Sequence, residues 1–348
     1  MKKNNIIFLY AELTPYLLGS LSFFKKHNPE YGIIVYYNSV FPNVDLSKYN
    51  FKFISKNNFS SKKDFFNDVK KYNPLILLVS GRMEKFYLYV SKKYKSKIKV
   101  VCLFDTIYTK SFSQFIKKNF SNFLYKPYFD IMWGTGSLQE KFALDIGYKP
   151  NMIKNGFYVA DNTFFKKKIK PNFKSKTTNF LFIGRLVKVK NIIVFAKILD
   201  EINILRDSNH TLGIIGKGIL LDELKKYKCV NYLGLKTQNQ ILKIVEGYNA
   251  FCLPSIYEPW GVVAHEMTAI GLPVLISNKC GSSHDLVKDG YNGFVFNPKS
   301  NLSIRNSIDK FLDLSYNDKI DMSIKSKKLA NNINHSNWNQ TLLSLINL

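Results

Sequence analysis

Short apolar runs alternate with longer amphipathic stretches through the first half of the chain. Six runs have the length and the β-branched or aromatic content of buried strands, namely residues 5–10, 33–37, 52–54, 75–80, 100–104 and 131–133. Between several of them apolar residues return at helical spacing, as in residues 62–72 and 85–94. Strands that alternate with helices are typical of a parallel sheet with helices on both faces. The first half therefore predicts an α/β, doubly wound domain.

The same alternation returns in the second half, after a stretch of different composition. Residues 157–178 are rich in lysine and polar residues, with KKKIK at 166–170 followed by Pro171, and lack periodicity. Beyond them we expect strands at residues 179–184, 211–218, 230–234, 250–253, 274–277 and 289–296. A chain of 348 residues is too long for one ordinary core. We therefore expect two Rossmann-like domains, residues 1–160 and 161–335, and a separate C-terminal segment, residues 336–348.

Residues 250–274 carry a pattern suited to a phosphate and two sugars. Glu258 and Glu266 stand eight positions apart around the start of a helix that we expect from Gly261. A helix N-terminus offers unpaired N–H groups and a positive dipole end to a phosphate, and a glycine there lets the ligand come close. A carboxylate on each side can accept hydrogen bonds from sugar hydroxyls. The alternative is a solvated Glu258 and a Glu266 that pairs with a lysine.

Two cations follow the strand that ends in Gly184. The guanidinium of Arg185 can bind a phosphate through two parallel hydrogen bonds. Lys190, at the start of a helix, can neutralise the phosphate as a point charge. Together they suit a diphosphate; otherwise they are exposed cations beside a positive dipole end. The next strand also ends in glycines, and at Gly216 a base or ribose could approach the backbone.

Ligands of doubly wound sheets bind beyond the carboxyl ends of the strands. In the first half Glu12, Arg82 and Asp105 occupy such positions. Asp105 can hold an acceptor hydroxyl or act as a base, and it can equally cap a helix or turn. Arg82 is most simply explained by a salt bridge. Ser137 and Glu140 have the S-x-x-E spacing of a capping box, which explains the serine without a ligand.

The chain is strongly basic, with a net charge of +26 from 51 Lys and Arg residues against 25 Asp and Glu. Only four of the basic residues are arginine, whereas nucleic-acid binders favour arginine for its bidentate contacts. We therefore expect no nucleic acid as partner, and nucleotide diphosphates or an anionic membrane face instead. No apolar run approaches the length of a membrane span, and the N-terminus does not resemble a signal peptide. The four cysteines, mostly within apolar runs, favour free thiols in a reducing cytoplasm.

Residues 111–128 interleave aromatic side chains with lysines. The apolar members recur at helical spacing: Phe112, Phe115, Ile116, Phe120, Phe123 and Leu124. Lys117, Lys118 and Lys126 lie off that stripe. Such a helix can rest on an anionic membrane, or it can pack its aromatic stripe into the domain core, which is the commoner outcome.

Six sequence blocks of the second half occur in one order: FIGRLVKVK, IIGKG, VNYLG, EPWGVVAHEMTAIGLPV, GSSHDLV and DGYNGFVF. With the spacing of Glu258 and Glu266 they resemble the C-terminal half of the retaining glycosyltransferases of family 4. Asn155-Gly156 resembles the Asn-Gly that precedes the linker in that family. The resemblance implies the GT-B architecture, in which two Rossmann-like domains face a central cleft. It also implies that about residues 337–348 form a helix that crosses back to the first domain.

The resemblance assigns the donor diphosphate to Arg185 and Lys190, the transferred sugar to Glu258 and the ribose to Glu266. Backbone amides at the start of the following helix would assist at Gly261 and Val262. 

Three positions depart from the family pattern. Asn191 stands where a glycine is usual, Ser282 replaces the second glycine of a Gly-Gly pair, and Asp285 replaces a glutamate. None of these changes removes a charge that the donor needs. The N-terminal half resembles the family in layout alone.

The activity implied is glycosyl transfer, with retained configuration, from a nucleotide diphosphate sugar to a glycan or lipid-linked acceptor. A UDP-sugar is the expected donor, and bacterial surface polysaccharide or lipopolysaccharide synthesis the expected setting. Glu258 and Asp105 are the catalytic candidates. No D-x-D pair occurs in the chain, so we expect neither a metal nor another cofactor. The expected location is the cytoplasm, peripheral on the inner membrane face. The alternatives are a nucleotide-sugar epimerase or sugar phosphorylase of the same architecture, or a basic anion-binding protein.

Overall fold

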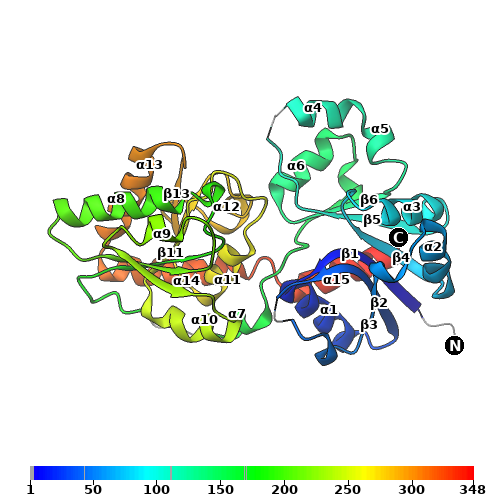
Figure 1. Cartoon of the computed structure of the whole chain (residues 1–348), viewed down its shortest axis with the longest axis horizontal. Coiled ribbons are helices and arrows are strands. Elements are labelled where there is room, and N and C mark those ends of the chain that lie inside the picture. Colours follow the sequence, from blue (N-terminus) through cyan, green and yellow to red (C-terminus); the bar gives the residue numbers. More distant parts are fainter. Residues whose placement is uncertain (1–3, 43, 110–111, 168, 170) are drawn as a thin grey trace. The chain divides into compact units, whose positions relative to one another are not determined.

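The computed structural model describes residues 4–42, 44–109, 112–167, 169 and 171–348 (Figure 1). The chain divides into two compact units, Met1–Asp161 with Asn334–Leu348, and Asn162–Ile333. Each unit contains one parallel sheet with its own helices. Lys168 and Lys170, which belong to the lysine-rich stretch expected between the domains, lie outside the described residues.

The first unit is built on a seven-stranded sheet in the order β3-β2-β1-β4-β5-β6-β7. Its strands are β1 (Asn4–Leu13), β2 (Tyr31–Val40), β3 (Lys52–Ser55), β4 (Pro74–Ser80), β5 (Lys99–Phe104), β6 (Ile131–Gly134) and β7 (Ile153–Lys154). All neighbours pair in parallel. The strand order reverses between β1 and β4, which is the place where a doubly wound sheet opens a crevice for ligands.

Seven α-helices belong to the described part of the first unit: α1 (Pro15–His27), α2 (Lys62–Lys71), α3 (Lys85–Tyr94), α4 (Phe112–Asn119), α5 (Ser121–Leu124), α6 (Ser137–Asp145) and α15 (His335–Ile346). The 3-10 turns are Leu46–Lys48, Lys56–Asn58 and Pro150–Met152. The helix starts follow local chemistry, because Ser61 caps α2 by accepting from Asp64 N and Glu84 caps α3 by accepting from Phe86 N.

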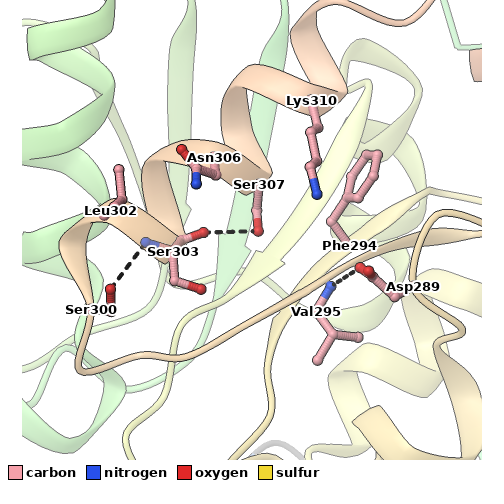
Figure 2. A pocket seen from close by; sticks show the side chains of 9 residues that line it. All are labelled: Asp289, Phe294, Val295, Ser300, Leu302, Ser303, Asn306, Ser307 and Lys310. Carbon is pink, nitrogen blue, oxygen red and sulfur yellow. Dashed lines mark hydrogen bonds between the residues drawn. The ribbon is translucent and has the colours of Figure 1, made fainter.

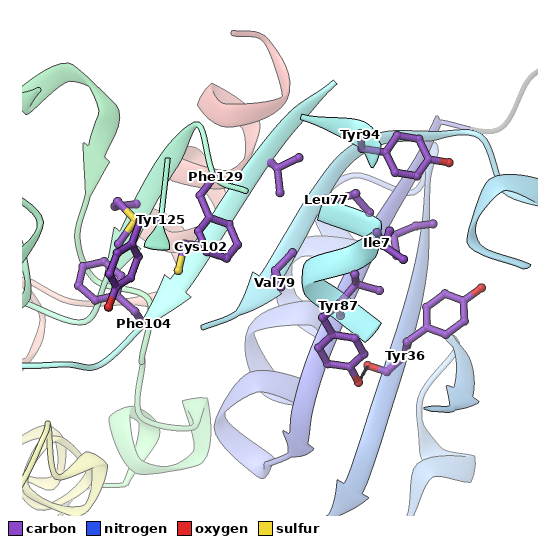
Figure 3. Close-up of a cluster of buried hydrophobic side chains, with 14 of the residues drawn as sticks. Ile7, Tyr36, Leu77, Val79, Tyr87, Tyr94, Cys102, Phe104, Tyr125 and Phe129 are labelled. Atoms are coloured by element: carbon purple, nitrogen blue, oxygen red, sulfur yellow. Dashed lines mark hydrogen bonds between the residues drawn. The ribbon is translucent and has the colours of Figure 1, made fainter. Parts of the chain in front are cut away.

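One face of this sheet is covered by α2, α3 and α6. Alternate strand residues such as Ile7 and Leu77 point into the same buried cluster as Tyr87 of α3 (Figure 3). The intervening residues Ile6 and Phe8 are equally buried. Because successive side chains of a strand point to opposite faces, the sheet is covered on both sides, as the continuous apolar runs predict.

The C-terminal helix α15 packs on the other side of the first unit, beside α1 (Figure 1). Trp338 is 1% exposed, and its Nε1 donates to the Phe157 carbonyl at 3.0 Å. Asn28 Nδ2 donates to Asn339 Oδ1 at 2.6 Å. The segment that follows the second unit in sequence is therefore part of the core of the first.

The second unit has a six-stranded parallel sheet in the order β10-β9-β8-β11-β12-β13. Its strands are β8 (Asn179–Ile183), β9 (Thr211–Ile215), β10 (Val230–Gly234), β11 (Ala250–Leu253), β12 (Val274–Ser277) and β13 (Gly293–Phe296). Its helices are α7 (Asn162–Lys166), α8 (Ile192–Leu205), α9 (Leu221–Leu224), α10 (Gln238–Ile244), α11 (Val262–Ile270), α12 (Ser283–Leu286), α13 (Asn301–Leu312) and α14 (Tyr316–Ala330), with 3-10 turns at Lys188–Lys190 and Val245–Gly247. The predicted fold class, two Rossmann-like α/β units, is confirmed.

Two local expectations are wrong. The capping box fails because α6 begins at Ser137 itself, with Gly136 at the N-cap and no side-chain capping bond. Glu140 instead accepts a hydrogen bond from Asn155 Nδ2 at 2.6 Å. The aromatic stripe does not pack into the core either, since Phe112 and Phe123 are 77% and 74% exposed.

The four cysteines are buried and unpaired, as expected. Burial raises the pKa of the Cys102 and Cys280 thiols, which keeps them protonated and unreactive. Among the helices in the described ranges, none combines the length and the apolar character needed to cross a bilayer.

Candidate functional site

The turn between β11 and α11 holds the residues predicted to meet the donor sugar. The helix begins at Val262, and Gly261 occupies its N-cap with a φ of +87°. A Cβ at Gly261 would lie 3.0 Å from Leu253 Cδ2 and 3.2 Å from Glu258 Cγ. Both the backbone conformation and the space therefore require glycine, which leaves the first amides of the helix uncovered by a side chain. Glu266 lies half-buried within α11.

Lys190 and Glu258 form an ion pair across 68 residues of sequence. The pair is largely withdrawn from water, because the two side chains are only 14% and 15% exposed. The loop after β12 holds Glu258 in place, since Glu258 N donates to Lys279 O and Gly281 N donates to Glu258 O. Neither the solvated Glu258 nor the exposed Lys190 of the alternative interpretations is present. The two charges neutralise each other in the ligand-free protein.

The ends of β8 and β9 approach each other at glycines. Gly184 N donates to Ile215 O at 3.0 Å, and a Cβ at Gly216 would meet Gly184 O at 1.9 Å. No residue other than glycine fits position 216 without moving the backbone. Arg185 follows directly and is exposed, and no salt bridge engages it within the ranges that the structure describes. Its guanidinium is thus available to an anionic ligand.

Asn191, which departs from the family glycine, closes the turn between Lys190 and α8. Its φ is +56° and its ψ is 21°, a left-handed conformation that asparagine tolerates better than most residues. The side chain donates from Nδ2 to the Pro298 carbonyl at 3.0 Å. The substitution therefore keeps the backbone path that leads Lys190 to Glu258.

Three buried polar atoms in or beside the β11–α11 turn lack a hydrogen-bond partner within the described residues. They are Ser255 Oγ, Ser282 Oγ and Trp260 Nε1, in residues that are 0%, 0% and 1% exposed. Ser282 Oγ would lie 3.5 Å from a Cβ at Gly261, so it points towards the N-cap of α11. Unsatisfied buried polar groups are costly and often mark a ligand or water site. In the sequence Ser282 stands out only as a departure from a family pattern, because the hydrogen-bonding surroundings of a side chain are visible only in three dimensions.

In the first unit Asp105 follows β5 and lies near a cluster of three tyrosines. Burial of the hydroxyls raises the pKa of Tyr10, Tyr16 and Tyr158, and the charge of Asp105 adds to the rise. The Tyr16 and Tyr158 rings lie 4.8 Å apart between centroids. Among the described residues the next helix begins at Phe112, so the helix-cap alternative for Asp105 is wrong, while its role in a turn stays a prediction. The tyrosines were missed, since an aromatic residue in an apolar run looks like ordinary core.

The other two polar residues at strand ends have simpler surroundings. Glu12 is exposed within β1. The Arg82 guanidinium carbon lies 5.2 Å from the centre of the Tyr125 ring, a cation–π contact. The salt bridge expected for Arg82 does not occur within the described ranges. A planar cation on an aromatic face explains why arginine stands here in a lysine-rich chain.

A hollow of about 260 Å³ lies elsewhere on the second unit, between β13 and α13 (Figure 2). Asp289, Phe294 and Lys310 are among its lining residues, and Asp289 Oδ1 accepts from Val295 N at 2.8 Å. None of the residues predicted to bind the donor lines it.

Residues 163–333 match a family described as glycosyl transferases group 1. A UDP-Gal:alpha-D-GlcNAc-diphosphoundecaprenol alpha-1,3-galactosyltransferase of Escherichia coli is 32% identical over 170 residues, which are 45% of this chain and 42% of that protein. An uncharacterised glycosyltransferase of Methanocaldococcus jannaschii is also 32% identical, over 38% of this chain and 35% of its own length. The chain thus spans less than half of these two relatives.

Solved glycosyltransferase structures resemble the whole chain. One from Rickettsia africae has a TM-score of 0.78 at 16% identity and covers 99% of this chain and 98% of its own. The Anabaena protein HepE, solved with UDP and glucose, has a TM-score of 0.77 at 15% identity and covers 99% of both chains. At such identity the likeness shows the fold alone, and the narrower assignment to family 4 stays a prediction. Residues 163–333 therefore match the glycosyl transferases group 1 family, and the fold of the chain is that of the GT-B glycosyltransferases.

Proposed function

We propose that the protein moves a sugar from a UDP-sugar to a glycan or lipid-linked acceptor, with retention of configuration. The observation that carries the proposal is the Lys190–Glu258 pair beside the glycine-capped start of α11. A partly buried ion pair next to uncovered helix amides places a cation, a carboxylate that can accept hydrogen bonds from sugar hydroxyls, and backbone N–H donors within one small region of the second unit. A nucleotide diphosphate sugar has a complementary group for each.

In this proposal the diphosphate lies at the exposed Arg185, the Lys190 ammonium and the amides of Gly261 and Val262. The donor replaces one side of the ion pair, so that Lys190 turns to phosphate while Glu258 accepts hydrogen bonds from sugar hydroxyls. Glu266 then holds the ribose. The cations stabilise the negative charge that grows on the leaving diphosphate, which is electrostatic transition-state stabilisation and requires no metal ion.

Asp105 of the first unit is proposed to meet the acceptor hydroxyl. Its position at the carboxyl end of β5, beside the buried tyrosine hydroxyls, supports this role. The relatives support the choice of substrates: the Escherichia coli protein is named for UDP-Gal and a diphosphoundecaprenol-linked acceptor, and HepE was solved with UDP. A peripheral position at the inner face of the cytoplasmic membrane, in surface polysaccharide synthesis, follows from that acceptor class.

The test is release of the nucleoside diphosphate from a panel of UDP- and GDP-sugars. We expect Arg185→Ala and Glu266→Ala each to lower turnover of the preferred donor by about 100-fold or more, because each removes a group that stabilises the bound donor or its leaving group. Lys188→Ala, on the same turn as Lys190 but exposed, is the matched control and should keep its activity. Circular dichroism checks that each variant is folded.

Near-normal turnover in both variants would rule the pocket out. Product analysis without acceptor separates the alternatives, since an epimerase would return an isomeric nucleotide sugar. A chain that consumes no donor from the panel and only binds anions in a salt-dependent way would be a basic binding protein.

A further inference from the structure

The helices α4 and α5 expose an unusual number of large apolar side chains. Those between residues 112 and 123 are Phe112 (77% exposed), Phe115 (61%), Ile116 (41%), Phe120 (54%) and Phe123 (74%). Elsewhere in the first unit, exposed large apolar residues such as Phe41, Leu75 and Leu144 are scattered in sequence. Single exposed apolar residues are normal, whereas a contiguous set indicates a surface that meets another apolar phase.

The helix α4 turns its apolar side outwards, unlike a helix whose apolar side packs against the core. Several of its polar side chains contact the protein: Gln114 is 4% exposed, and its Oε1 accepts from Thr109 N at 2.7 Å. Lys117 lies over the Phe142 ring of α6, and Lys118 Nζ donates to Asp145 Oδ1 at 3.1 Å while the Lys118 side chain remains 54% exposed. A surface helix of a globular protein normally buries its apolar stripe and exposes its charges. Here the phenylalanines are left on the outer side.

The surroundings of this apolar face are cationic. No Asp or Glu occurs in the sequence from Thr106 to Phe129, while lysines of the described residues stand at positions 117, 118 and 126. Arg82 adds a guanidinium over Tyr125, directly after α5. A second copy of the chain would bring like charges together on this face, which disfavours self-association. A bilayer with anionic headgroups offers both an acyl boundary for aromatic side chains and phosphates for the lysines.

We propose that α4 and α5 dock the protein on an anionic lipid bilayer, with Phe112, Phe115 and Phe123 entering the headgroup boundary. This gives the membrane position of the proposed function a specific surface, but it stands on the exposed apolar side of α4 and not on the donor site. The docking proposal and the donor-site proposal can therefore be disproved independently of each other. Donor turnover measured without membranes tests the pocket, and vesicle binding measured without donor tests the docking surface.

The experiment is sedimentation of the full chain with vesicles of phosphatidylcholine alone or mixed with phosphatidylglycerol. We expect binding to the anionic vesicles that weakens as salt rises. The combined variant Phe112→Ser, Phe115→Ser and Phe123→Ser should lose about tenfold or more of the partition coefficient, because three apolar side chains no longer enter the bilayer. Ile204→Ser, Leu205→Ser and Ile219→Ser change three side chains of the second unit that are equally exposed (81%, 75% and 82%) and should bind like the wild type.

The serine variant should keep its circular dichroism and its membrane-free donor turnover, because the replaced side chains lie outside the core. Equal binding of the wild type and of this variant would overturn the proposal. Equal binding of the wild type to neutral and anionic vesicles would also overturn it. The same holds if the wild type does not bind vesicles and instead dimerises in solution through these phenylalanines.

Discussion

At the scale of single residues, the candidate donor site is built from groups that compensate one another. Lys190 and Glu258 neutralise each other while they are withdrawn from water, so neither carries an unpaired buried charge before the donor arrives. Gly261 leaves the start of α11 open, and Gly216 allows two strand ends to touch. The exception is Ser282, whose buried hydroxyl lacks a partner within the described residues. A group that costs stability and remains unpaired is a candidate for function.

Ser282→Ala should separate stability from activity. Removal of an unsatisfied buried hydroxyl is expected to raise the free energy of unfolding by about 1 kcal/mol, while the KM for the donor rises because a hydrogen-bonding group beside Gly261 is lost. Urea unfolding and steady-state kinetics measure the two effects.

The neighbouring Ser283→Ala is the control for that substitution. Ser283 Oγ donates to Cys280 O at 2.7 Å, so its removal should lower the free energy of unfolding by about 1 kcal/mol. If Ser282→Ala destabilises the protein and leaves KM unchanged, the hydroxyl has only a structural role.

At the scale of elements, the C-terminal helix shows how a segment can be essential to a unit from which it is far removed in sequence. α15 packs against α1 through the Ser20–His335 contact at 3.2 Å and the Asn28–Asn339 hydrogen bond. Trp338 fills the centre of this contact, with its ring 5.1 Å from the Trp133 ring between centroids. The helix therefore completes the core of the first unit.

Trp338→Ala should destabilise the first unit by about 3–5 kcal/mol, because it leaves a large cavity and an unpaired Phe157 carbonyl. Gln340→Ala, on the exposed side of the same helix, should change the free energy of unfolding little. Thermal unfolding followed by tryptophan fluorescence and circular dichroism compares them. Equal stabilities of the two variants would mean that α15 is not docked in solution.

At the scale of the whole molecule, each unit contains a buried histidine that is held neutral. Burial lowers the pKa of His210 in the second unit, helped by Arg206 and Lys319, and burial also lowers that of His335 in the first. The role of His210 requires the neutral ring, since its Nδ1 accepts from Thr178 N at 3.0 Å. With a net charge of +26, further protonation also adds to repulsion within the chain.

Stability should therefore fall on the acid side. A histidine whose folded pKa lies below the ordinary 6.5 contributes stability that is present above that value and is lost as the pH falls through the folded pKa. We expect a lower midpoint of urea unfolding at about pH 5 than at about pH 7.5. The difference between the two midpoints should be smaller in the variants His210→Asn and His335→Asn. A midpoint that does not change over this range in the wild type would contradict the expectation.

Except for the two-residue β7, the strands were predictable, as was the β11–α11 turn, because they depend on local pattern: apolar runs, a turn at Pro254 and a glycine before a helix. Features that depend on distant neighbours were predicted wrongly. Arg82 lies on Tyr125 instead of meeting a carboxylate. Ser137 begins a helix that it does not cap. The phenylalanines of α4 face outwards, and periodicity alone cannot tell which side of a stripe meets the core.

The sequence by itself determined the two α/β halves, the group 1 resemblance and the types of residue that the donor site offers, because periodicity and ordered motifs are properties of neighbouring positions. Only the tertiary structure decided that Lys190 pairs with Glu258, that the buried Ser282 hydroxyl finds no partner among the described residues, and that α4 presents its apolar side outwards. Each of these depends on which segments, remote along the chain, exclude water from the same place.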